Sequence, residues 1–143
     1  MEKLKGGKRK KIVEDLKEYG IIIKQPIYFK NNSIYLLTPK AIQLLLQIEK
    51  EKIKVFGGFY LGKMEKTGLR LSFDACQLFS NQIKKYIEID DEKARRWFNG
   101  EDIEVKTEKE GFFVLKNKED FIGCGFVKDG KIKNYVPKDR REK

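Results

Sequence analysis

The sequence contains no histidine, and its 143 residues include only two cysteines, Cys76 and Cys124. These two residue types supply most ligands of structural zinc, and histidine is the usual general base at neutral pH, so neither a zinc site nor histidine-based catalysis is expected. Cys76 lies in an apolar helical pattern, and Cys124 lies between two glycines in an apolar strand pattern. Both are therefore predicted to be small buried side chains rather than reactive thiols.

Long apolar runs and cofactor loops are also missing. No stretch approaches the roughly 18 apolar residues of a membrane span, and no apolar segment follows the basic N-terminus, so a cytoplasmic protein is predicted. The glycine pairs fit neither G-x-G-x-x-G nor a P-loop, so no cofactor is predicted. The acidic cluster at 90–92 could hold a hard cation, but aspartates at a helix start more often cap the helix. No catalytic constellation emerges, and the chain is predicted not to be an enzyme.

Anionic side chains are outnumbered by cationic ones. Lysine and arginine total 32 against 22 acidic residues, which gives a net charge of +10. This excess favours an anionic partner without naming it. Of the cations, 26 are lysines, and the high lysine and glutamate content is also typical of thermophile surfaces, so part of the charge can serve stability alone.

The first third of the chain predicts a small α/β module. A flexible basic arm is expected before a helix that ends at Gly20. Two strand-like runs, "IIIKQPIYF" and "SIYLLT", flank a turn at 30–32, although Pro26 weakens the first run. A second helix is expected over 38–52, because Thr38 and Pro39 form a good helix start. The arm and this module occupy residues 1–52.

From residue 53 onward the pattern changes to many short strands. Turn signals lie at 66–68, 117–120 and 129–130, and two helices are expected, one over 74–86 and one ended by Gly100. Trp97 and Phe98 at the end of the second helix are read as core rather than as an RNA-stacking patch. The fold class is therefore α+β, with the N-terminal module followed by a compact β-barrel, rather than a parallel sheet, with short helices over 53–143.

The C-terminal strand combines charge with an aromatic ring. Lys131, Lys133 and Tyr135 alternate with apolar and amide side chains, so they share one face. Ammonium groups beside a ring suit a phosphate backbone and a stacked base. Residues 131–143 carry six cations and two anions. The alternative is a solvated edge strand protected by lysines, and charge and alternation alone do not decide between the two.

Several motifs carry a family resemblance. "WFNGEDIEV", "GFFVLK", "FIGCGFVKDGKIKNYVPKDRR" and, upstream, "GGFYLGKMEKTGLRLSFDA" resemble the C-terminal PUA domain of Sun-type RNA cytosine-C5 methyltransferases over about residues 53–142. The preceding module is placed like the pre-PUA segment of those proteins. No S-adenosylmethionine-binding glycine loop and no Pro-Cys or Thr-Cys catalytic motif accompanies these motifs. The resemblance therefore implies a PUA-like mixed β pseudo-barrel that binds RNA without a catalytic domain.

The predicted function is non-catalytic binding of structured RNA, tRNA or rRNA, in RNA modification or ribosome biogenesis, with a separate modifying enzyme or a ribosomal protein as a further partner and no membrane contact. The alternative is a protein-interaction adaptor subunit of such a complex, in which the charge serves solubility. Asn134, which belongs to the last motif, can instead be structural and bond a neighbouring turn. The predicted RNA-binding residues are Lys63, Lys66, Arg70, Lys131, Lys133, Asn134, Tyr135, Lys138, Arg140 and Arg141.

Overall fold

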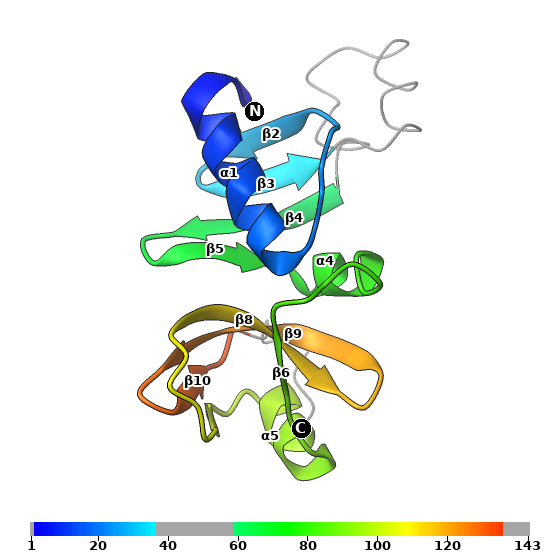
Figure 1. Cartoon of the computed structure of the whole chain (residues 1–143), viewed down its shortest axis with the longest axis vertical. Coiled ribbons are helices and arrows are strands. Elements are labelled where there is room, and N and C mark those ends of the chain that lie inside the picture. Colours follow the sequence, from blue (N-terminus) through cyan, green and yellow to red (C-terminus); the bar gives the residue numbers. More distant parts are fainter. Residues whose placement is uncertain (1, 37–58, 136–143) are drawn as a thin grey trace.

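The computed structural model describes residues 2–36 and 59–135, which form two β-sheets stacked along the long axis of the molecule, with short helices beside them (Figure 1). The helix predicted over 38–52, the boundary predicted between residues 52 and 53, and the predicted RNA-binding residues Lys138, Arg140 and Arg141 lie outside the described residues. The α+β class and a PUA-like mixed β domain with short helices are as the sequence predicted.

The first sheet is antiparallel, and its five strands follow one another in chain order. The turn predicted at 30–32 is present, and Asn31 and Asn32 both have positive φ, as a tight hairpin turn requires. The strand predicted to begin at Ile21 starts only at Ile27, directly after Pro26, which has no backbone N–H to donate to a neighbouring strand. The strands are β1 (Glu2–Lys3), β2 (Ile27–Lys30), β3 (Ser33–Leu36), β4 (Phe59–Glu65) and β5 (Gly68–Leu71).

Helix α1 (Gly6–Tyr19) packs across one face of this sheet (Figure 1). Its buried side chains Ile12, Leu16 and Tyr19 recur at helical spacing. The helix ends as predicted at Gly20, whose positive φ lets its N–H bond the carbonyls of the last turn. The flexible arm predicted before this helix was wrong: β1 pairs with β2, and Leu4 is buried in the core, so the segment is held in place.

An irregularity in the first sheet lies between β3 and β4. Ile34 pairs with Gly62, but the next pair is Tyr35 with Tyr60, so Leu61 is an extra residue on β4. Such a β-bulge sends two consecutive residues to the same side of the sheet. Leu61 is accordingly buried beneath α1, and Gly62 next to it pairs with the buried Leu71.

The second sheet is mixed. Its strand order is β6-β8-β9-β10-β7, with β6 parallel to β8 and the other neighbours antiparallel. The turns predicted at 117–120 and 129–130 join β8 to β9 and β9 to β10, with Lys118, Asp129 and Gly130 at positive φ. The strands are β6 (Tyr86–Glu88), β7 (Ile103–Glu104), β8 (Gly111–Asn117), β9 (Asp120–Lys128) and β10 (Lys131–Lys133).

Two short helices flank the second sheet. α5 (Asp91–Phe98) begins where Asp90 Oδ1 accepts a 2.8 Å hydrogen bond from the Lys93 N–H, so the capping role of this aspartate is confirmed. α4 (Phe73–Leu78) is capped by Ser72 and is shorter than the predicted 74–86. The difference has a physical reason: after turns at 79–82 the chain is held extended, because the Lys84 N–H bonds the Tyr19 carbonyl and β6 pairs with β8.

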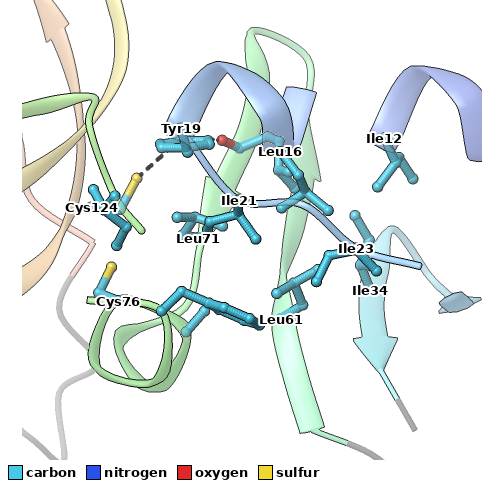
Figure 2. Close-up of a cluster of buried hydrophobic side chains, with 14 of the residues drawn as sticks. Ile12, Leu16, Tyr19, Ile21, Ile23, Ile34, Leu61, Leu71, Cys76 and Cys124 are labelled. Carbon is cyan, nitrogen blue, oxygen red and sulfur yellow. Dashed lines mark hydrogen bonds between the residues drawn. The ribbon is translucent and has the colours of Figure 1, made fainter. Parts of the chain in front are cut away.

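One apolar core connects the two sheets. Figure 2 shows Ile12, Leu16 and Ile21 from the N-terminal segment above Leu61 and Leu71, with the two cysteines beside them. In the same figure, Tyr19 points to Cys124 of β9, and its hydroxyl lies 3.5 Å from Cys124 Sγ and donates a 2.5 Å bond to the Leu69 carbonyl. Both cysteines are unpaired and buried, as predicted. Burial raises the pKa values of both thiols, which keeps them protonated and unreactive.

Asp15 on α1 supplies a pH-dependent prediction. Burial raises the pKa of its carboxyl, although Lys11 Nζ, 3.9 Å from Oδ2, opposes this effect. The folded state therefore binds this proton more tightly than the unfolded chain. Stability falls as pH rises from the unfolded-state pKa of about 3.9 through the raised folded-state pKa, and it stays lowered at neutral pH. We expect Asp15→Asn to raise the melting temperature at pH 7 but not at pH 3. Equal shifts at both pH values in thermal unfolding would contradict this origin.

Candidate nucleic-acid interface

Three tyrosines form a row across the face of the first sheet that lies opposite α1. Tyr28 pairs with Tyr35 across β2 and β3, and Tyr35 pairs with Tyr60 across β3 and β4, so the three side chains share one face. The rings of Tyr35 and Tyr60 have centroids 5.6 Å apart. All three are half-buried, which leaves ring surface open to solvent. A row of aromatic rings on a sheet is the kind of platform on which unstacked bases pack.

Cations line the same face, and the bulge at Leu61 is what places Lys63 on it. Tyr60 and Lys63 are three residues apart and would point to opposite sides of a regular strand. Because of the extra residue, Lys63 pairs with Ser33 and Arg70 on the tyrosine side. We call this surface the tyrosine face; it consists of Tyr28, Lys30, Tyr35, Tyr60, Lys63 and Arg70.

Arg70 connects the tyrosine face to the second sheet. Its guanidinium carbon lies 4.6 Å from the centroid of the Tyr135 ring, and Lys133 Nζ lies 5.5 Å from the same centroid. Arg70 also forms an ion pair of 3.2 Å with Glu65, which holds the side chain in place. The structure therefore brings together four of the predicted residues from segments more than 60 residues apart: Lys63, Arg70, Lys133 and Tyr135.

Tyr135 is held by its neighbours. Its ring lies 5.8 Å from that of Phe112, and it packs against the core that joins the two sheets. With Arg70 above the ring, one face of Tyr135 is engaged within the protein. The three tyrosines of the first sheet are consequently better placed than Tyr135 to stack on a base.

Asn134 is tied to the end of α5. Its side-chain nitrogen donates to the carbonyls of Trp97 at 2.7 Å and Glu101 at 2.8 Å, and its backbone N–H donates to Asp102 Oδ1 at 2.8 Å. Both hydrogens of the amide group are thus used inside the protein. This geometry supports the structural reading of Asn134 over a base-reading role.

The remaining predicted cations lie on turns and edges. Lys66 is exposed in the turn between β4 and β5, and Lys131 is exposed on β10, where it pairs with Glu104 of β7. The tyrosine row itself was missed by the sequence analysis. Its only signal was an aromatic residue in each of three strand-like runs, and that signal does not reveal the register that aligns them.

Burial raises the pKa of Tyr60, which keeps its hydroxyl protonated, although the charge of Arg70 opposes the shift. Within residues 2–36 and 59–135, no three acidic or cysteine side chains gather as a metal site would require. In the same described part of the chain, no helix is long and apolar enough to cross a membrane.

Relatives of the chain are found among rRNA methyltransferases. It is 27% identical over 131 residues to a "Ribosomal RNA small subunit methyltransferase F" of Vibrio vulnificus, which covers 90% of this chain and 27% of that protein. A protein of the same name from Vibrio cholerae serotype O1 is 25% identical over 116 residues, which covers 79% of this chain and 24% of the relative. The chain therefore spans about a quarter of the length of these relatives.

A family model described as the methyltransferase RsmF PUA domain matches residues 84–142. The described part of this match contains β6 to β10 with α5, which is the whole second sheet. The resemblance seen in the sequence motifs is thereby confirmed. Residues 84–142 of this chain are therefore similar to a PUA domain of the RsmF methyltransferase type.

Proposed function

We propose that this chain is a non-catalytic RNA-binding protein that acts in the cytoplasm on structured RNA during rRNA or tRNA modification. The proposal rests mainly on one observation: three cations lie beside two tyrosines at the junction of the two sheets. The cations are Lys63, Arg70 and Lys133, and the tyrosines are Tyr60 and Tyr135. The cations would contact phosphates, and the tyrosines would stack on exposed bases.

The comparisons support this proposal at a coarser level. The matched PUA family belongs to methyltransferases, and the similar Vibrio proteins are named as enzymes of ribosomal RNA. This favours RNA over an acidic membrane surface as the anionic partner that the +10 charge predicts. A separate modifying enzyme or a ribosomal protein is a further proposed partner.

The adaptor reading has less support in the described residues. Only Ile22 and Leu78 are large apolar side chains that are well exposed there, at 61% and 57%. Single exposed apolar residues are ordinary on a protein surface. Partner binding that does not respond to salt would revive this reading.

Salt-dependent binding tests the proposal. We expect affinity for a fluorescently labelled rRNA hairpin to fall with salt, and Lys63→Ala and Lys133→Ala each to reduce the slope of log K against log salt by about 0.7 to 0.9, because each removes one phosphate contact. Fluorescence anisotropy at several salt concentrations measures this. The matched control is Lys10→Ala, an exposed residue of α1 on the helix that covers the other face of the sheet. Identical slopes in all four proteins would refute the assignment of this face.

The bound RNA can be identified in cells. Ultraviolet crosslinking in the protein's own cells, followed by sequencing of the attached RNA, is expected to give a few discrete rRNA or tRNA positions. Mass spectrometry of the crosslinked peptides should place the adduct on Tyr35 or Tyr60. Crosslinks spread evenly over all cellular RNA would argue against a specific role in modification.

A further inference from the structure

Two parallel rows of side chains cross the first sheet on the tyrosine face. Strand pairing places one residue of each strand in the first row, which from β1 to β4 consists of Lys3, Tyr28, Tyr35 and Tyr60. The second row lies one side-chain repeat further along the strands, and from β2 to β5 it consists of Lys30, Ser33, Lys63 and Arg70. The first is therefore mainly a tyrosine row, and the second is mainly a cationic row.

The separation of the two rows suits the two ends of a nucleotide. Side chains that follow one another on one side of a strand are about 7 Å apart, because the strand rises about 3.4 Å per residue. In a nucleotide, the sugar separates the base from its phosphate in a similar way. An RNA strand that runs across the β-strands can therefore lay its bases on the tyrosine row while its phosphates follow the cationic row.

The cationic row has charge available for phosphate. Strand pairing also places Glu65 on this face, opposite Gly68, and its carboxylate pairs with Arg70 at 3.2 Å. A guanidinium group has five N–H donors, so Arg70 can bind Glu65 and a phosphate at the same time. Lys63 forms no ion pair with any side chain in the two ranges that the structure describes. The charge of this face thus complements an anionic strand.

The tyrosine row can stack bases on its open side but not between its rings. The ring centroids of Tyr35 and Tyr60 lie 5.6 Å apart, and the ring planes are inclined by 47°. A base between two parallel rings needs about 7 Å, because each of its two contacts takes about 3.5 Å. The row is therefore a platform rather than a clamp. Stacking on such a platform tolerates any base, because every base has a flat π-face.

Base-paired RNA cannot use this platform. In an A-form duplex the bases stack on one another, so the duplex presents phosphates, hydroxyl groups and base edges but no flat base surface along its length. A duplex would meet the cationic row and leave the tyrosine rings unused. Unpaired bases, in contrast, stack in twos or threes on the aromatic side chains of a β-sheet.

We propose that the tyrosine face binds an unpaired stretch of the RNA, about three nucleotides long, that runs across β2 to β4 with its bases on the tyrosine row and its phosphates on Lys63 and Arg70. This inference rests on the proposed function and names the part of the RNA that the first sheet takes. The family match at residues 84–142 does not include this sheet. The first sheet is thus a binding surface additional to the second.

Three RNA duplexes that differ only at one end test this inference. The first is blunt, the second carries an extension of about three unpaired nucleotides, and the third carries the same extension with abasic riboses. The two extensions have the same phosphates, so a difference in affinity between them comes from the bases. Fluorescence anisotropy at several salt concentrations measures the binding of the full chain to each duplex, with the extension at the 5′ or the 3′ end.

The extension with bases is expected to bind at least about fivefold more tightly than the abasic one, because stacking of a single base on an aromatic ring contributes that much. This ratio should not change with salt, since both extensions release the same counterions. Equal affinities for the two extensions would overturn the platform and leave the proposed RNA binding intact. Absence of binding to all three duplexes would overturn the proposed function as well.

Variants assign the stacking to the first sheet. Tyr35→Leu removes the middle ring of the row and should lower the ratio by about fivefold, whereas Tyr35→Phe keeps the ring and the ratio. Tyr86→Leu is the matched control, because Tyr86 is a half-buried tyrosine of the second sheet. An unchanged ratio in Tyr35→Leu would refute the assignment to this face. Circular dichroism checks folding, and Tyr28→Leu gives the same comparison should Tyr35→Leu fail to fold.

Discussion

Reversing two charges at the junction of the sheets, Lys63→Glu with Lys133→Glu, is expected to weaken RNA binding by at least roughly tenfold at 0.15 M salt. Each phosphate contact on single-stranded RNA releases counterions with a slope of about 0.7, which is worth about fourfold in affinity at that salt concentration. Two lost contacts give about fifteenfold, and the new carboxylates repel the backbone as well. Anisotropy with the rRNA hairpin measures the change.

The matched control reverses two charges elsewhere. Lys8→Glu with Lys10→Glu gives the same change in net charge on exposed positions of α1, the helix that covers the opposite face of the first sheet. If long-range attraction by net charge alone drives binding, both double variants will lose affinity equally, and the interface assigned here is wrong. Retained affinity in the control with loss at the sheet junction confirms a localised site.

Gly62→Ala is expected to have the largest effect on stability. A Cβ at this position would lie 2.2 Å from the backbone oxygen of Arg70 and 3.2 Å from Leu71 Cα. Neither is the flexible end of a side chain, so β4 and β5 must separate or the bulge must be lost. We expect a loss of about 3 kcal/mol or more in the free energy of unfolding, at the upper end of overpacking costs. Denaturant unfolding followed by circular dichroism measures it.

Gly7→Ala is the control: the same substitution at a position where the added methyl group meets no other atom. No atom lies within 4 Å of a Cβ built at Gly7, which stands in the first turn of α1. Alanine lowers the entropy of the unfolded chain and favours the helix, so a gain of up to about 1 kcal/mol is expected. Similar losses in both variants would show that the contact at Arg70 is not the cause.

Local chemistry in the sequence predicted much of the secondary structure. The helix that starts at Asp91, its cap at Asp90 and the stop of α1 at Gly20 depend on hydrogen bonds between near neighbours, and the paired Asn31 and Asn32 determine a hairpin turn in the same way. Predictions made from periodicity alone were less accurate. The apolar residues of segment 79–86 recur at helical spacing, but residues 79–82 form turns, and contacts of Lys84 with Tyr19 and of β6 with β8 hold the rest extended.

The candidate interface was only partly predictable from local patterns in the sequence. Lys133 and Tyr135 were placed on one face from alternation, and their contact supports that placement. Their meeting with Arg70 depends on how two sheets pack, and the alignment of Tyr60 with Lys63 depends on one extra residue in β4. Neither is encoded in a local pattern, because a bulge breaks the period on which face assignments rest.

The core that joins the two sheets also has a consequence for synthesis on the ribosome. Tyr19 contacts Cys124, which is 105 residues further along the chain. At translation rates of about 5–20 residues per second, α1 must wait on the order of 5–20 seconds after its own synthesis before β9 exists to cover Tyr19. During that interval the Tyr19 end of the helix faces water or a chaperone. Contacts of such long sequence separation slow folding, so we expect the first sheet to become fully protected only after the second has been translated.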